Sequence, residues 1–264
     1  MDIEELISNI DRYDEITKQF YNNYIKDKDL SFDKLLKNSL KQSSFKMNVN
    51  KIILRKSFLN LVEKKNLKMD NDFLKLLIKK PQRSFSGIQS VSILTSPYPS
   101  WVDDDVTHIQ EFSCKHNCYF CPDERDKNDK MIMPRSYLSR EPACRRGLRN
   151  NFDPIEQIYD RLFSLENQGH PLDKLELIVL GGTVLEYPRE YLEYFIRQCF
   201  FICNMYPLKS GRDMLSLEEE QKLNETSKIR IIGLTLETRP DGINHESIYF
   251  LRRLGVTRMQ IGIQ

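Results

Sequence analysis

The sequence predicts an α/β fold, an incomplete parallel (β/α) barrel preceded by a small, basic, all-helical region. Two patterns support this prediction. Residues 1–80 show helical periodicity alone, whereas short apolar runs alternate with amphipathic helical patterns over residues 90–263. We therefore expect two domains, residues 1–80 and 81–264, joined by the stretch KKPQRSFSG.

The N-terminal region combines helical periodicity with a large positive charge. Between Lys34 and Arg83 there are fourteen Lys or Arg residues and three acidic residues. A field of this sign attracts polyanions, so a tRNA-binding role is one interpretation. A lysine-rich surface that only faces solvent is the alternative, and both interpretations stay open here.

The second region supplies strands and helices in alternation. Strands are expected at 90–96, 174–182, 228–238 and 256–263, with helices at 153–169, 188–206 and 245–255. The run KLELIVLGG is typical of a buried parallel strand, and residues 209–228 are expected to form a polar surface excursion. About four strands are too few to close an eight-stranded barrel. A second polypeptide that completes the barrel is therefore an expected partner, unless the chain is a shortened form.

The composition places the protein in the cytoplasm. No apolar run approaches the ~20 residues of a membrane span, and the acidic start MDIEELISNIDRYDEI is unlike a signal peptide. Thiols stay reduced inside the cell, so six cysteines indicate metal or redox chemistry rather than disulfides. We expect no membrane partner.

Three cysteines, Cys114, Cys118 and Cys121, lie in the stretch FSCKHNCYFCPDE. Three thiolates can hold three corners of a 4Fe–4S cube and leave one iron open to a small molecule. The spacing Cys-x3-Cys-x2-Cys, with Phe120 before the last cysteine, is the signature of radical S-adenosylmethionine (SAM) enzymes. We therefore expect a 4Fe–4S cluster and SAM as cofactors.

A zinc-stabilised structural protein is the alternative. Structural zinc takes four ligands, and the fourth would be Cys144, His116 or His108. We favour the cluster because the cysteines follow a strand and precede a series of βα units. Cys199 and Cys203 lie one helical turn apart in apolar surroundings, so we interpret them as core thiols.

Six residues at the carboxyl ends of predicted strands are candidates for SAM contacts, because the Gly-Gly pair and the IGIQ ending resemble SAM-contacting motifs of radical SAM enzymes and because ligands bind at these ends of parallel strands. They are Gly181, Gly182, Thr183, Glu237, Arg239 and Gln264. A Gly-Gly pair lets a ligand approach the backbone closely. The structural alternatives are a tight turn for the glycines, an ion pair for Arg239 and a polar strand end for Gln264.

Together these motifs resemble the catalytic subunit of Elongator, a radical SAM protein that modifies the wobble uridine of tRNA. The resemblance covers the last two-thirds of the chain and rests on EPACRRGLRNNFDP, GHPLDKLELIVLGGT, YPREYLEYFIRQ and GLTLETRPD. It implies a partial radical SAM barrel, tRNA as partner and acetyl-CoA as co-substrate. The implied reaction forms 5-carboxymethyluridine, by hydrogen abstraction from the acetyl methyl group and addition of the acetyl radical to C5 of uridine.

The resemblance also implies roles for single residues. Cys118 and Cys121 match the last two cluster ligands of the family. Lys174 matches a lysine that contacts acetyl-CoA, and Arg146 and Arg149 match positions near tRNA.

Two features depart from the family pattern. His108 stands where the family has its first cluster cysteine, so Cys114 is assigned in its place. The rest of the barrel and the acetyltransferase domain are missing from this sequence. A catalytically incomplete relative that binds tRNA is therefore an alternative function.

Overall fold

The computed structural model describes residues 9–263, except 104, 113 and 117. The chain divides into two compact units. Unit 1 ends at Ser86 and also includes residues 164–171, and unit 2 holds residues 87–163 and the chain from Leu172 onward. The domain boundary between residues 80 and 81 stays a prediction.

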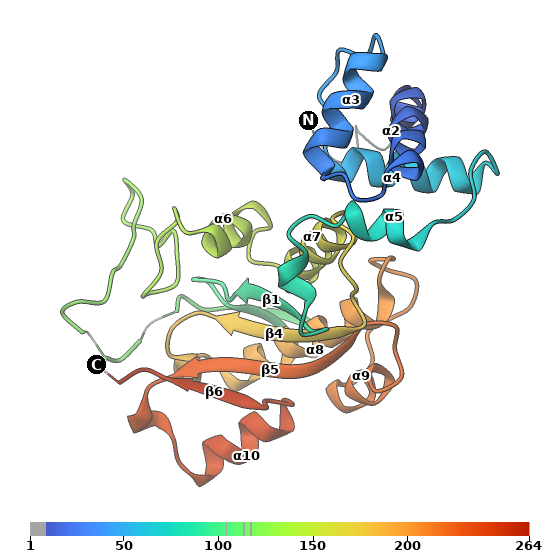
Figure 1. Ribbon diagram of the computed structural model, residues 1–264. Helices are drawn as coiled ribbons and strands as arrows, with labels where there is room; N and C mark the ends of the chain where they lie inside the picture. The colour runs from blue at the N-terminus through green and yellow to red at the C-terminus, as the bar shows by residue number, and fades with distance from the viewer. Residues whose placement is uncertain (1–8, 104, 113, 117, 264) are drawn as a thin grey trace. The chain divides into compact units, whose positions relative to one another are not determined.

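Unit 1 is helical. Its elements are η1 (Ile10–Tyr13), α2 (Asp14–Lys26), α3 (Phe32–Gln42), α4 (Lys51–Glu63), α5 (Asn71–Leu76) and η2 (Pro81–Ser84) (Figure 1). Polar side chains cap the helices, as where Asn50 accepts hydrogen bonds from the first backbone N–H groups of α4. The core is aromatic: Phe20, Phe58 and Phe73 are fully buried, and the rings of Phe58 and Phe73 lie 4.8 Å apart. The predicted N-terminal helical region is confirmed.

Unit 2 contains a parallel sheet of four strands in the order β1-β4-β5-β6. The strands are β1 (Gln89–Leu94), β4 (Lys174–Leu180), β5 (Arg230–Thr238) and β6 (Arg258–Ile261). Helices α7 (Pro154–Asn167), α8 (Arg189–Met205) and α10 (His245–Arg253) lie between successive strands in the sequence, and α8 runs behind β4 and β5 in Figure 1. The predicted α/β class with a parallel sheet is confirmed. None of the helices in the described ranges has the length and apolar character needed to cross a bilayer.

The two faces of the sheet differ in burial. Along β4, Leu175, Leu177 and Val179 are almost fully buried, whereas Glu176 and Ile178 between them are only half-buried. Successive side chains of a strand point to opposite faces. One face of β4 is therefore packed and the other is covered only in part, so the continuous apolar run in the sequence does not make a strand buried on both sides.

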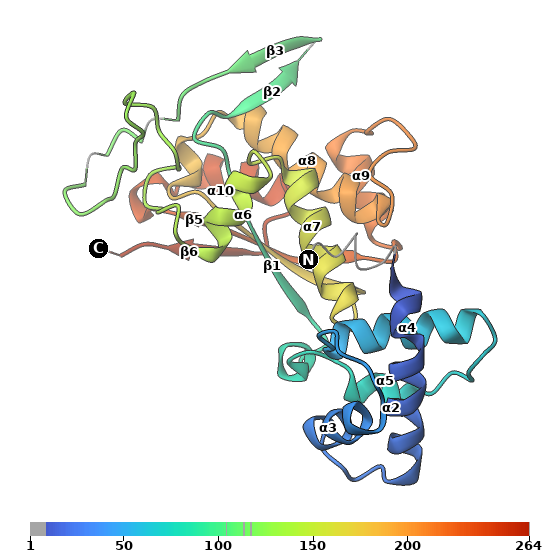
Figure 2. The ribbon, with the colours of Figure 1, turned by 90° about the horizontal axis from the view of Figure 1, so that it is seen from above.

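Several elements were not predicted. Strands β2 (Ser100–Asp103) and β3 (Val106–Ile109) pair antiparallel, and this hairpin extends away from the parallel sheet (Figure 2). Helix α6 (Pro142–Arg149) precedes α7.

Residues 209–228 are not a plain surface excursion, because they contain α9 (Leu217–Asn224). Ser216 and Glu219 form a capping box at its start. Glu220 is fully buried and accepts two hydrogen bonds from the guanidinium of Arg212, at 2.5 and 2.7 Å. The polar composition of this segment concealed a helix whose buried carboxylate, Glu220, is neutralised by Arg212 from outside the helix.

Candidate functional site: a cysteine-lined pocket

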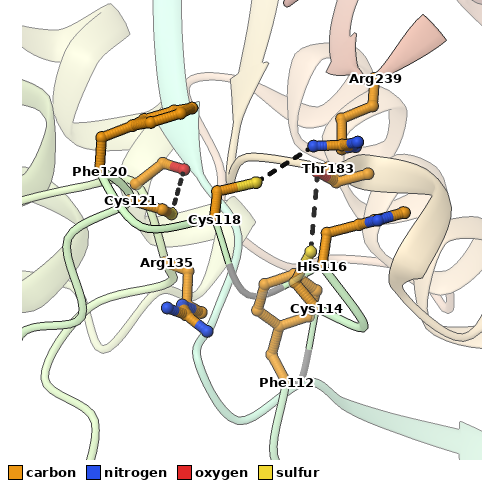
Figure 3. A pocket seen from close by; sticks show the side chains of 10 residues that line it. Phe112, Cys114, His116, Cys118, Phe120, Cys121, Arg135, Thr183 and Arg239 are labelled. Atoms are coloured by element: carbon orange, nitrogen blue, oxygen red, sulfur yellow. Dashed lines mark hydrogen bonds between the residues drawn. The ribbon is translucent and has the colours of Figure 1, made fainter. Parts of the chain in front are cut away.

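The three clustered cysteines line one pocket at the carboxyl ends of β4 and β5 (Figure 3). Its lining residues are Phe112, Cys114, His116, Cys118, Phe120, Cys121, Arg135, Ser136, Thr183 and Arg239. The structure thus brings together five of the residues singled out in the sequence. Two of them, Thr183 and Arg239, come from the loops that follow β4 and β5.

Each sulfur faces a polar neighbour. Arg239 Nη1 donates to Cys118 Sγ at 3.2 Å, and Cys121 Sγ lies 3.1 Å from the hydroxyl of Ser136 (Figure 3). Cys114 Sγ is the most loosely held, 4.0 Å from the Thr183 hydroxyl. All three thiols are free and half-buried, so they are available as ligands.

The donor set suits an iron–sulfur cluster and leaves one candidate for a zinc site. Three thiolates suit iron–sulfur ligation, and structural zinc needs a fourth ligand. Cys144 is fully buried among apolar side chains, where burial raises its pKa to about 11, and His108 stacks on Trp101 in the β2–β3 hairpin. Neither lines the pocket, whereas the third candidate, His116, does, with its Nε2 3.9 Å from Glu186 and 3.5 Å from Asp241. Within the described residues, no three His, Cys, Asp or Glu side chains are grouped closely enough to hold a metal ion, so the thiols share a pocket without forming a finished ligand geometry.

An aromatic stack fixes the chain just before the cysteines. The ring of Phe112 stacks on Tyr187 with 3.9 Å between centroids and 8° between planes. The backbone N–H of Phe112 donates to Pro97 O at 2.8 Å. Tyr187 is buried and receives a hydrogen bond from Thr95 at 2.8 Å. This buried anchor determines where the cysteine loop starts.

A second hollow adjoins the first and shares Ser136, Thr183 and Arg239 with it. Its other lining residues are Gly182, Glu237, Thr238, Gln260, Ile261 and Gly262. The volume is about 310 Å³, at the lower end of the ~300–1,000 Å³ typical of small-molecule sites. Four of the six predicted SAM contacts lie in this hollow.

The other two predicted contacts do not lie there. Gly181 packs beneath the hollow, and Gln264 lies outside the described residues. Gln260 lines the hollow although the sequence reasoning missed it. Gln260 pairs with Glu237 in the register of β5 and β6, which the sequence alone does not give.

Packing alone explains the glycine pair. A Cβ on Gly181 would lie 1.9 Å from the hydroxyl oxygen of Thr95. Gly182 has φ +80°, and a Cβ there would lie 3.0 Å from the carbonyl oxygen of Arg135. The tight-turn interpretation therefore accounts for both residues without a ligand, although the turn does leave backbone open to the hollow.

Glu237 and Tyr137 form a protonatable pair beside this hollow. The hydroxyl of Tyr137 donates to the carboxylate of Glu237. Burial raises the pKa of Glu237 and, together with that carboxylate, the pKa of Tyr137. Tyr137 was missed in the sequence because it belongs to none of the predicted strands or helices.

Lys174 lies at the opposite end of the sheet from the pocket. It is the first residue of β4, and its ammonium group pairs with Asp173 at 3.0 Å. Lys174 lies seven positions before Gly181 along the strand, a span of ~23 Å. The structure therefore does not bring Lys174 to the cysteines.

The two predicted tRNA-binding arginines of α6 have protein partners. Arg146 Nη2 donates to Ser92 O at 2.9 Å, and burial lowers the Arg146 pKa. Arg149 is exposed and forms an ion pair with Asp160. Arg146 thus packs against β1, and of the two only Arg149 presents its charge to solvent.

The chain resembles known proteins over about 70% of its length. It is 41% identical over 190 residues to the tRNA uridine(34) acetyltransferase of Methanocaldococcus infernus, covering 72% of this chain and 32% of that protein. It is 34% identical over 186 residues to human Elongator complex protein 3, covering 70% of this chain and 31% of the relative. The chain therefore spans about a third of the length of the curated relatives it matches.

Two further comparisons complete this result. A solved structure of M. infernus Elp3 with an N-terminal deletion aligns with a TM-score of 0.46 and 32% identity, over 67% of this chain and 29% of the other. No family model matches the chain. The sequence matches nevertheless confirm the resemblance expected from the motifs: over about 70% of its length the chain is homologous to proteins named tRNA uridine(34) acetyltransferase and Elongator complex protein 3.

Proposed function

We propose that this chain carries the cluster-binding core of a radical SAM enzyme that modifies the wobble uridine of tRNA. The observation that carries the proposal is the meeting of three free thiols with two strand-end loops at one pocket, next to a second hollow of ligand size. The named activity of the archaeal relatives, tRNA uridine(34) acetylation, supports tRNA as the substrate class.

The two hollows have separate proposed roles: the cysteine pocket would hold the cluster, and the second hollow would bind SAM. Cys114, Cys118 and Cys121 would hold a 4Fe–4S cluster, which when bound would supply the electron that cleaves SAM. In the second hollow, the Gly182 backbone and the Glu237 carboxylate offer an acceptor-rich wall to an ammonium group such as that of SAM.

Glu237 and Tyr137, beside the second hollow, are the titratable groups that a bound ligand would affect. Burial raises the pKa of Glu237, and the hydroxyl of Tyr137 donates a hydrogen bond to its carboxylate. A cationic ligand would shift that balance towards the carboxylate. We keep acetyl-CoA as the proposed co-substrate and Lys174 as its proposed contact, at a place separate from the cysteine pocket.

The test is anaerobic iron–sulfur reconstitution of the purified chain, followed by absorption and paramagnetic resonance spectra with and without SAM. We expect a cluster whose resonance spectrum changes when SAM is added. A colourless protein that retains zinc, or that binds no metal, would refute the proposal. Conversion of uridine to carboxymethyluridine in a tRNA substrate with acetyl-CoA is the subsequent assay.

The second candidate function is tRNA binding without catalysis, and the surface of unit 1 favours it. Lys34, Lys37 and Lys41 of α3 are exposed, and their spacing of three and four residues places them on one face of the helix. Replacing all three by Ala should weaken tRNA binding and lower the salt dependence by about three phosphate contacts. Unchanged binding would show that this face only meets solvent.

A further inference from the structure

Two carboxylates at the strand ends face the cysteine loop. Glu186 belongs to the short helix η3 (Val184–Glu186) after β4, and Asp241 belongs to η4 (Pro240–Gly242) after β5. Neither was assigned a role above. Both contact residues that lie between the pocket cysteines in the sequence.

Glu186 holds the first part of the loop. Its carboxylate lies 3.0 Å from the ammonium group of Lys115 and 3.9 Å from Nε2 of His116. The Glu186 side chain is 12% exposed, so water screens these contacts less than it screens a surface pair. This carboxylate therefore attaches the residues directly after Cys114 to the β4 side of the pocket.

Asp241 holds the second part of the loop through Arg239. The Arg239 guanidinium makes a two-point contact with Asp241, at 3.0 and 2.9 Å, which fixes its plane. The remaining nitrogen, Nη1, donates to Cys118 Sγ at 3.2 Å. Asp241 also lies 3.5 Å from Nε2 of His116.

We infer that Glu186 and Asp241 are positioning residues that clamp the cysteine loop onto the ends of β4 and β5 before any cofactor binds. Among the described residues of the loop, Lys115, Tyr119 and Phe120 are exposed, so these ion pairs add to the buried Phe112 anchor at its start. Two carboxylates, on the short helices that follow two neighbouring strands, fix it at two points. The inference deepens the proposed function, since a pre-ordered loop lowers the entropic cost of assembling a three-thiolate site.

The positioning role of Asp241 also changes the interpretation of Arg239. From the sequence, Arg239 was expected to contact SAM or to form a surface ion pair. The structure shows the ion pair, and the same guanidinium reaches a sulfur of the cysteine cluster. Arg239 therefore transmits the position of Asp241 to Cys118.

Hydrogen exchange of the metal-free chain tests the clamp without any cofactor. We expect the peptide spanning residues 112–121 to exchange roughly two- to fivefold faster in Glu186→Gln and in Asp241→Asn, the range of a partly exposed ion pair. Peptides from β4 and β5 should keep their rates, which shows that the sheet is still folded. The matched control is Glu225→Gln, which removes the acid of an exposed ion pair to Lys222 on α9 and should leave the loop unchanged.

A variant on the loop side separates the ion pair from any other effect of Glu186. Lys115→Met should raise the exchange rate as Glu186→Gln does, and the double variant should add little to either. In reconstituted protein, Lys115→Met and Glu186→Gln should each lose iron to a chelator faster than the wild type does.

The outcomes separate this inference from the proposed function. Unchanged loop exchange in Glu186→Gln and Asp241→Asn would overturn the clamp, whether or not iron is bound. Faster exchange in a chain that takes up no iron would support the clamp and refute the cluster.

Discussion

The two ends of the parallel sheet use charged residues in opposite ways. At the amino end, Asp173 pairs with the neighbouring Lys174 in solvent, and the ion pair lowers the Asp173 pKa. At the carboxyl end, Glu237 is half-buried beside a hollow, and burial raises its pKa. A carboxylate is thus ion-paired in solvent at one end, whereas at the other it is desolvated and accepts a hydrogen bond from the Tyr137 hydroxyl.

This difference indicates at which end of the sheet a ligand would gain binding free energy. A satisfied ion pair gains little from a new partner, whereas desolvated carboxylates and free thiols gain from a cation or a metal. Ligands of open α/β sheets bind at the carboxyl ends of the strands for the same topological reason. The predictions below test the contrast between the two ends, beginning with the largest expected effect.

The largest effect should come from the pocket thiols. Cys118→Ala should abolish cluster binding, because two thiolates cannot hold the cube in place. Cys199→Ala should leave iron content intact, since Cys199 is fully buried in α8, where its pKa is raised by burial. Iron and sulfide analysis after reconstitution measures both. Equal iron in the two variants would remove the distinction between pocket and core thiols.

A large stability effect should follow at the Gly-Gly turn. Gly181→Ala should cost about 2–4 kcal/mol of unfolding free energy, because its Cβ would collide with the Thr95 hydroxyl. Gly233→Ala, near the amino end of β5, meets no atom closer than 3.5 Å and should change stability by less than ~1 kcal/mol. Urea unfolding measures the free energy of unfolding of both variants. Similar unfolding midpoints for the two would contradict the steric argument.

The pH dependence of stability should have opposite signs at the two ends. Because the pKa of Glu237 is raised in the folded chain, its contribution to stability falls as the pH rises above its ordinary value of 4.5. Glu237→Gln should remove this fall and keep an acceptor for Tyr137. Asp173 has a lowered pKa, so its contribution is present above 3.8 and is lost on further acidification; Asp173→Asn should remove that loss. The measurement is the difference in unfolding midpoint between each variant and the wild type, followed from pH 3 to pH 8. If the two differences change with pH in the same direction, the predicted opposition between Glu237 and Asp173 is wrong.

The smallest effect should come from Lys174. Its ion pair is half-exposed, and exposed pairs contribute ~0–1 kcal/mol. Lys174→Ala should therefore leave unfolding, iron content and the SAM-dependent spectrum nearly unchanged. If it weakens acetyl-CoA binding in an equilibrium assay, the proposed contact gains support at a site apart from the cysteines. A loss of cluster would show instead that the two ends of the sheet are coupled.

Local patterns in the sequence predicted the regular elements better than the loops. The apolar run before Gly181 marked β4, and the helix expected over residues 153–169 is α7, which begins at Pro154. The β2–β3 hairpin was missed because its residues are largely exposed and carry no alternation of apolar and polar side chains. Helix α9 was missed because its buried charge, Glu220, is matched by Arg212 from outside the helix.

The sequence by itself determined a three-cysteine motif, a glycine turn after an apolar strand, and the resemblance that the relatives confirm. Only the tertiary structure decided which residues share a site. It placed Arg239 on Cys118, brought Glu186 and Asp241 to the cysteine loop, and left Lys174 at the other end. The reason is physical: spacing along the chain fixes local geometry, whereas contacts between distant loops depend on strand order and register.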